Sequence, residues 1–192
     1  MKIYDISQEV FSCAVYPGDP APQKQMLCAT AAGDLYNLTA FSMCAHNGTH
    51  MDAPFHFLGN GKTVDQLDLE SFVGECFVAR CEGEVTAETA WEILKKAAGI
   101  PRILIAGEAT VTAAAASVFA AGNLKLLGNE SQSVGPENAP MQVHKILLEK
   151  EIVLLEGIVL SGIPEGKYFL SAAPLKLAGA DGAPCRAYLI QL

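Results

Sequence analysis

Residues 46–56 read His-Asn-Gly-Thr-His-Met-Asp-Ala-Pro-Phe-His. This histidine-rich stretch holds three of the four histidines of the chain, His46, His50 and His56, together with Asp52. Neutral imidazoles and carboxylates are the side chains that bind zinc and similar divalent metals. The spacing favours a metal site of a hydrolytic enzyme over a chance cluster of histidines on a solvated loop.

The local conformation of this stretch is predicted to be a turn or irregular loop. His46 and His50 are four residues apart, but Gly48 and Pro54 interrupt a helix. Gly48 lets the backbone fold back tightly, so that the two histidines converge. Asp52 follows His50 by two residues and would point to the same side of an extended chain.

Strands are predicted on both sides of the histidine-rich stretch. Alternating and aromatic patterns mark the ranges 2–7, 24–31, 35–45 and 75–81. Gly33-Asp34 joins the second range to the third, and the third leads directly to His46. A strand end is a rigid support for a ligand.

The middle of the chain alternates predicted helices with predicted strands. The first helix covers about 87–98, with Thr86 as its N-terminal cap and Trp91 as a predicted core residue. The second is an alanine-rich segment that Thr110 or Thr112 caps and Gly122 ends. The third covers about 138–150. The strands cover 102–106, 124–127 and 151–160, and two more are expected in 167–192 around the turn 179–184. This order predicts an α/β fold with a mixed sheet and flanking helices.

Composition narrows the class of protein. The 192 residues fit one domain, 1–192, and 51% of them are hydrophobic. The net charge is −8 without any basic run, which argues against nucleic-acid binding. No apolar run of about 18 residues predicts a membrane span, and the N-terminus does not resemble a signal peptide. Six dispersed cysteines are expected to be reduced, mostly core residues of a cytoplasmic protein.

Two distant residues complete the set of candidate ligands. His144 lies beside an apolar helical stripe, and Glu156 lies within an almost wholly apolar strand. A buried carboxylate is costly unless it is paired or binds a metal. The alternatives are a packed or surface histidine, and an edge strand with Glu156 facing solvent. With His46, His50 and Asp52 these residues could hold two divalent metals if a carboxylate bridges.

Two functional roles stay open at the level of spacing. His56 is left as a candidate general acid/base, because imidazoles as a class change charge near neutral pH. The spacing does not decide which histidine is a ligand and which carries protons. Tyr16 precedes a proline-rich loop, Pro17–Pro22, and is either the wall of a pocket or a loop anchor. Neither a Gly-x-Ser-x-Gly motif nor a phosphate-binding glycine loop is present.

The pattern His-x-Gly-Thr-His-x-Asp-x-Pro-x-His resembles the signature of the metal-dependent cyclase-like hydrolase family, which includes bacterial kynurenine formamidases and isatin hydrolases. Other segments resemble that family in the same order along the chain. They are Ile3–Ser7, the Pro-Gly-Asp loop after Tyr16, the pair His144 and Glu156, Pro174–Leu177 and Asp181–Arg186.

The resemblance implies a swivelling β/β/α domain that forms homodimers or larger homo-oligomers. It implies that His46, His50 and Asp52 bind a first metal, that Asp52 and Glu156 bridge, and that His144 completes a second site. The implied metals are two Zn²⁺ per site, with Mn²⁺ as the alternative. The implied reaction is hydrolysis of an amide C–N bond in a small substrate by metal-bound hydroxide.

The same resemblance gives His56 the role of proton carrier and Tyr16 that of a substrate-binding residue. Tyr16 stands where the kynurenine formamidase pattern has a tryptophan; a tyrosine can still stack on an aromatic substrate, but it is smaller and adds a hydroxyl group. The resemblance implies an aryl formamide, such as N-formylkynurenine, or a cyclic amide as the substrate. The alternatives are a cyclase or lactonase on the same metal site, and a metal-binding module without catalysis.

Overall fold

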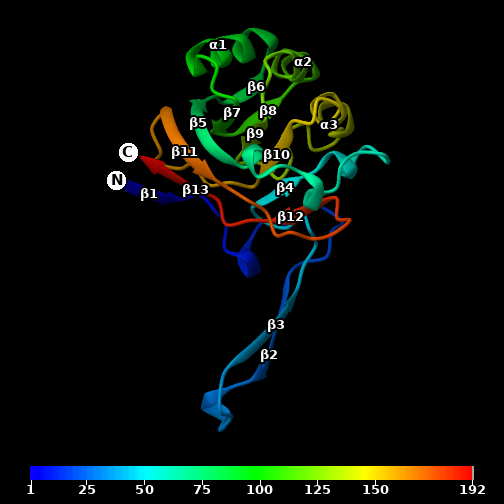
Figure 1. Cartoon of the computed structure of the whole chain (residues 1–192), viewed down its shortest axis with the longest axis vertical. Coiled ribbons are helices and arrows are strands. Elements are labelled where there is room, and N and C mark those ends of the chain that lie inside the picture. The colour runs from blue at the N-terminus through cyan, green and yellow to red at the C-terminus, as the bar shows by residue number, and fades with distance from the viewer. Residues whose placement is uncertain (192) are drawn as a thin grey trace.

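A mixed β-sheet runs through the computed structural model, which describes residues 1–191 (Figure 1). Within those residues the sheet has nine strands, in the order β1-β13-β11-β5-β7-β9-β10-β4-β12. Their bounds are β1 Lys2–Asp5, β4 His50–Asp52, β5 Val73–Arg80, β7 Arg102–Ala106, β9 Leu126–Asn129, β10 Val153–Glu156, β11 Gly166–Ser171, β12 Gly182–Pro184 and β13 Tyr188–Gln191.

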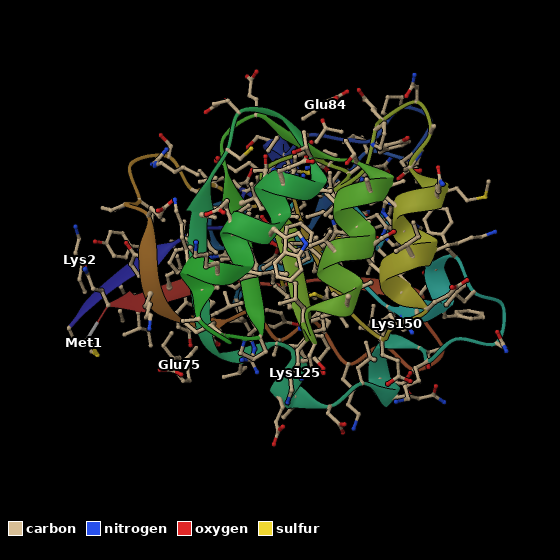
Figure 2. All side chains as sticks on the ribbon, turned by 90° about the horizontal axis from the view of Figure 1, so that it is seen from above. Met1, Lys2, Glu75, Glu84, Lys125 and Lys150 are labelled. Atoms are coloured by element: carbon tan, nitrogen blue, oxygen red, sulfur yellow. The ribbon has the colours of Figure 1, made fainter. Side chains whose placement is uncertain are left out.

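The middle of the sheet is parallel, and its crossovers are helical. Strands β5, β7, β9 and β10 pair in parallel, while the strands at both edges pair antiparallel. Figures 1 and 2 show the helices side by side on one face of the sheet. They are α1 Ala87–Ala97, α2 Ala113–Ala121 and α3 Met141–Leu148, and the short strands β6 Gly83–Val85 and β8 Ala109–Val111 pair beside them. The α/β prediction is confirmed.

The core occupies both faces of this sheet. Strand β7 is buried along its whole length, as a strand covered on both sides must be. Ile103 and Ile105 pack in the cluster beneath the helices, whereas Leu104 packs in the cluster on the opposite face. The alternation of side chains along the strand therefore supplies both halves of the core.

The helices begin where the sequence predicts. The hydroxyl groups of Thr86 and Thr112 accept hydrogen bonds from backbone N–H groups in the first turns of α1 and α2. The prediction that Trp91 is a core residue is wrong, because the Trp91 side chain is 66% exposed. The buried face of α1 consists of Ala90, Ile93 and Ala97, and Trp91 lies outside that stripe.

The histidine-rich stretch is more regular than predicted. Residues 46–49 form a turn, as expected, but His50–Asp52 form strand β4 and Pro54–His56 a 3₁₀ turn. Strand β4 pairs with β10 on one side and with β12 on the other. Hydrogen bonding on both sides holds these three residues extended, although the sequence around them favours a loop.

The C-terminal part also differs from the prediction. Strand β10 ends at Glu156 and lies between β9 and β4, so the alternative of an edge strand with an exposed Glu156 is wrong. The predicted tail of two strands contains three, β11, β12 and β13, because the predicted turn continues into β12. Leu192, the last residue of that predicted tail, lies outside the described residues.

Strands β2 Gln23–Cys28 and β3 Leu38–Ser42 form a separate hairpin that projects from the body (Figure 1). Within residues 1–191, no helix is both long and apolar enough to cross a membrane. All six cysteines are free, but only Cys76 is buried, so the expectation that most cysteines are core residues is wrong.

Candidate metal centre

The predicted ligands gather where β4, β10 and α3 meet. His50 and Asp52 come from β4, Glu156 from the end of β10, and His144 from α3. Each of these four residues is at least 98% buried. Glu156 is the register partner of His50 across the β10–β4 pair, so two residues 106 positions apart are neighbours on adjacent strands. The side chains of His50 and Asp52 lie on the same face of β4, because alternate residues of a strand do so.

Two of the imidazoles are oriented by backbone carbonyl groups. Nδ1 of His50 lies 2.9 Å from the carbonyl oxygen of Gly48, and Nδ1 of His144 lies 2.9 Å from that of Pro140. A carbonyl oxygen only accepts hydrogen bonds, so Nδ1 carries the hydrogen in both rings. The Nε2 atoms therefore face the carboxylates, as they do in histidines that bind a metal.

The spacing of the ligand atoms fits a divalent ion. Nε2 of His50 lies 3.4 Å from Oδ1 of Asp52 and 3.5 Å from Oε2 of Glu156. Nε2 of His144 lies 3.5 Å from Oδ2 of Asp52 and 3.2 Å from Oε1 of Glu156. Ligands about 2.0–2.2 Å from a tetrahedral ion stand roughly 3.4 Å apart. Among the described residues Oδ2 of Asp52 has no hydrogen-bond partner, although it is buried. A cation would satisfy that oxygen.

The charges of this cluster compensate one another in the protein without metal. Burial lowers the pKa of His50 and of His144, but contacts with Asp52 and Glu156 outweigh it and raise each pKa to about 10. Burial raises the pKa of Asp52, yet contacts with histidines bring it well below its usual value. The buried site is therefore built for charged carboxylates that have cationic neighbours.

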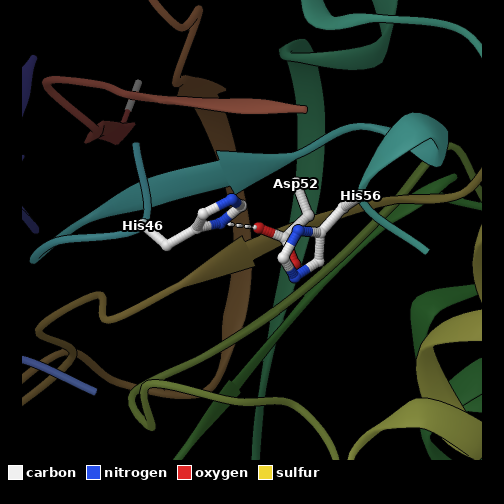
Figure 3. A group of neighbouring side chains, drawn as sticks. All are labelled: His46, Asp52 and His56. Carbon is white, nitrogen blue, oxygen red and sulfur yellow. Dashed lines mark hydrogen bonds and ion pairs between the residues drawn. The ribbon is translucent and has the colours of Figure 1, made fainter. Parts of the chain in front are cut away.

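His46 and His56 lie next to Asp52 of this cluster (Figure 3), and both are only partly buried. Nδ1 of His46 is 2.8 Å from Oδ1 of Asp52, and its Nε2 is 2.9 Å from Oδ2 of Asp181. The same Asp181 oxygen lies 3.1 Å from Nδ1 of His56. His46, Asp52 and His56 also offer ligand atoms within 4.8 Å of one another, and so do His50, Asp52 and Glu156. Asp52 thus belongs to both groups that could hold an ion.

Asp181 is a site residue that the sequence analysis did not single out. Its carboxylate connects His46 to His56, and contacts with both histidines lower its pKa although burial opposes this. The next residue, Gly182, packs directly against the His46 ring. A Cβ atom on Gly182 would lie 2.7 Å from Cε1 of His46, so only glycine fits against that ring. The sequence alone shows neither contact, because an aspartate before a glycine is typical of an ordinary turn.

A cavity of about 430 Å³ opens in front of these residues. Tyr16 lines it, and the Tyr16 hydroxyl group donates a hydrogen bond of 2.6 Å to the carbonyl oxygen of Glu137. Tyr16 is therefore both a wall of the pocket and a loop anchor. Gln132 and Ser133 line the same cavity from the polar loop after β9. Among the described residues their side-chain polar atoms find no hydrogen-bond partner.

Comparisons with known proteins show the family of this chain. Residues 4–155 match a family model named Cyclase and described as "Putative cyclase". The kynurenine formamidase of Erythrobacter litoralis (strain HTCC2594) is 32% identical over 205 aligned residues, which cover 100% of this chain and 94% of that protein.

Solved structures share the fold over nearly the whole chain. A protein described as a "Potential Metal-Dependent Hydrolase With Cyclase Activity" superposes with a TM-score of 0.84 at 26% identity, over 98% of this chain and 96% of its own. Isatin hydrolase A from Labrenzia aggregata, bound to benzyl benzoate, gives a TM-score of 0.84 at 22% identity, over 98% of this chain and 93% of its own. At that level of identity the second comparison speaks for the fold alone.

Proposed function

The chain belongs to the cyclase family of metal-dependent hydrolases, and from this membership we propose that it hydrolyses an amide C–N bond in a small substrate. The observation that supports the proposal most directly is the buried cluster of two imidazoles and two carboxylates, with nitrogen–oxygen distances of 3.2–3.5 Å. Such a cluster is costly to bury in a protein that does not use it.

We assign the metal ligands as follows. His46, His50 and Asp52 would hold a first divalent ion, and His144 would complete a second site. Asp52 and Glu156 would serve both sites: Asp52 belongs to both groups of candidate ligand atoms, and Glu156 oxygens lie 3.5 Å from Nε2 of His50 and 3.2 Å from Nε2 of His144. When bound, the ions supply Lewis acidity: they polarise the carbonyl of the substrate and lower the pKa of water.

His56 is the proposed proton carrier. It stands at the mouth of the buried cluster, with its side chain 26% exposed, and lines the cavity. Amide hydrolysis adds a water oxygen to the carbonyl carbon and breaks the C–N bond, so a proton must move from the water to the leaving nitrogen. His56 takes up that proton and passes it on. Asp181 holds the His56 ring and stabilises it while it is positively charged.

The substrate class follows from the cavity and the relatives. We propose an aryl formamide such as N-formylkynurenine, or a cyclic amide such as isatin. The cavity volume of about 430 Å³ suits a single aromatic ring with a short side chain. The Tyr16 hydroxyl group is bound to the Glu137 carbonyl oxygen, which leaves the Tyr16 ring to stack against the substrate.

We also propose the identity of the metal, the cellular compartment and the assembly. The metal is proposed to be Zn²⁺, with Mn²⁺ as the alternative, since imidazole and carboxylate ligands suit both. The enzyme is proposed to act in the cytoplasm, in keeping with its six free cysteines. We further propose that residues 1–192 form one hydrolase domain and that the protein works as a homo-oligomer.

A hydrolysis screen tests the function. The purified protein is loaded with Zn²⁺ or with Mn²⁺ and assayed on N-formylkynurenine, isatin, simple formanilides and an aryl lactone. We expect turnover of at least one amide with one of the metals and none after chelation. Hydrolysis of the lactone alone would show that the protein is a lactonase and not an amidase. No turnover of any substrate by the metal-bound protein would overturn the proposal.

A further inference from the structure

Asp19 is an acidic residue on the wall of the cavity to which the proposed reaction gives no role. It ends a tight turn that begins at Tyr16, and its backbone N–H group donates a 3.0 Å hydrogen bond to the Tyr16 carbonyl oxygen. Pro17 and Gly18 occupy the middle of this turn, and the φ angle of +99° at Gly18 is one that glycine adopts easily. Asp19 and Tyr16 both line the cavity. The turn therefore places a carboxylate beside the ring that is proposed to stack on the substrate.

The Asp19 carboxylate has no cationic partner within residues 1–191. Its only side-chain hydrogen bond there comes from Sγ of Cys44, which lies 3.6 Å from Oδ2. A thiol is a weak donor, so this contact leaves the negative charge uncompensated. None of the ion pairs among the described residues involves Asp19. Asp19 is partly buried, and a cation stabilises a partly buried carboxylate more than one in open water.

The other carboxylates of the cavity wall already have partners. Asp181 contacts His46 and His56, and Glu156 contacts His144 within the buried cluster. Among the described residues that line the cavity, none is a lysine or an arginine. The wall therefore offers a bound substrate one unpaired charge, and that charge is negative.

The charge of the whole chain acts in the same direction. The net charge is −8, from 21 acidic and 13 basic residues. The field of such a protein attracts cations and repels anions before they reach the cavity. A substrate with an ammonium group would gain free energy on approach and again beside Asp19. A remote carboxylate group on the substrate would find no cationic side chain on the wall.

We infer that Asp19 is a specificity-determining residue that selects a positively charged substrate. The substrate class is then an aryl formamide or cyclic amide with an ammonium group on a short side chain. This inference rests on the proposed function and narrows its substrate class. In the bound state the amide faces the metal centre, the ring stacks on Tyr16 and the ammonium group pairs with Asp19. A neutral amide such as isatin lacks that pairing and is expected to be a poorer substrate.

Three formanilides that differ only in their meta substituent test the inference. The substituents are an aminomethyl, a hydroxymethyl and a carboxymethyl group, and each probe is assayed near neutral pH with protein loaded with Zn²⁺ or Mn²⁺. We expect kcat/KM to be about five- to tenfold higher for the cationic probe than for the neutral one, as one partly exposed ion pair would give. The preference should shrink as salt is added. Equal kcat/KM for these two probes, or a higher value for the anionic probe, would overturn the inference.

Two variants of Asp19 and one control separate its charge from its place in the turn. Asp19→Asn keeps the size of the side chain and should bring the ratio of kcat/KM between the cationic and the neutral probe to about one. Asp19→Lys should place the anionic probe above the cationic one. The control Asp68→Asn removes the same charge from an exposed residue outside the cavity and should keep the natural ratio. A natural ratio in Asp19→Asn, or a lost ratio in the control, would refute the assignment.

Dissociation constants distinguish a failure of this inference from a failure of the proposed function. Turnover of all three probes without a charge preference would leave the hydrolase in place and remove the role of Asp19. If no probe is hydrolysed, the proposed function fails, and calorimetric titration of the metal-loaded protein with the same probes then tests Asp19 directly. Tighter binding of the cationic probe, lost in Asp19→Asn, would support the inference without hydrolysis. Equal affinities for the cationic and the neutral probe would overturn it.

Discussion

The contact between Asp181 and His56 gives the sharpest prediction. The change Asp181→Asn keeps the size of the side chain but removes its negative charge. Hydrogen bonds to charged groups contribute about 1.5–3 kcal/mol, and the Asp181 side chain is 42% exposed, which favours the lower end. A loss of about 1.5 kcal/mol in the transition state corresponds to roughly a tenfold fall in kcat. The variant should keep its metal, because its remaining oxygen can still accept from Nε2 of His46.

The assay compares kcat, KM and bound metal for the natural enzyme and two variants. Asp68→Asn is the control, since it removes the same charge from an exposed residue that contacts no histidine. It should leave kcat within about twofold. If Asp181→Asn retained full kcat with full metal content, Asp181 would have no role in holding the proton carrier. If it lost metal in proportion to activity, Asp181 would act through His46 instead.

Three further predictions concern the same site. His56→Ala should retain its metal and lose turnover by about 10²–10⁴-fold, measured by metal analysis and steady-state kinetics; activity near the natural level would remove His56 from proton transfer. Since His50 and His144 have pKa values raised from 6.5 to about 10 in the metal-free protein, their contribution to stability is complete below pH 6.5 and is lost as the pH rises through 10. Metal-free protein should therefore melt at lower temperature as the pH rises from 7 to 10, while metal binding, which must displace these protons, should tighten over that range; a melting temperature that rises with pH would contradict this. Gly182→Ala would place a Cβ atom 2.7 Å from His46 and from the Met51 carbonyl oxygen, and should cost about 1–3 kcal/mol of stability in denaturant titrations along with metal affinity.

Local signals made much of the fold predictable. The caps Thr86 and Thr112 lie next to the helices they begin, and the apolar strand 102–106 has the predicted bounds. Features that depend on distant partners were missed. Residues 50–52 are extended because β10 and β12 pair with them on both sides. Trp91 is exposed because the buried face of α1 consists of Ala90, Ile93 and Ala97 and does not include it. The neighbouring sequence indicates neither the extended conformation of residues 50–52 nor the exposure of Trp91.

The candidate site, like the fold, was predictable where neighbouring residues carry the signal and not where distant residues do. Three histidines and an aspartate within eleven residues could be recognised by type and spacing alone. Glu156 was singled out by its apolar strand and His144 as a further imidazole, and the family resemblance then gave both residues their roles. The structure brings both into contact with Asp52 or His50. Asp181 is 125 residues from His56, and within its own segment it looks like an ordinary turn residue before glycine. Its part in the site becomes visible only when β12 pairs with β4.

The position of β4 between β10 and β12 sets the order of events during biosynthesis. The histidine-rich stretch leaves the ribosome early, but the strands that flank it follow about a hundred residues later. At roughly 5–20 residues per second, β4 waits on the order of ten seconds for β12. Until then the imidazole of His50 and the carboxylate of Asp52 remain without their neighbours from β10 and β12. The candidate metal centre is therefore incomplete in the nascent chain, so we expect the metal to bind only after translation is complete.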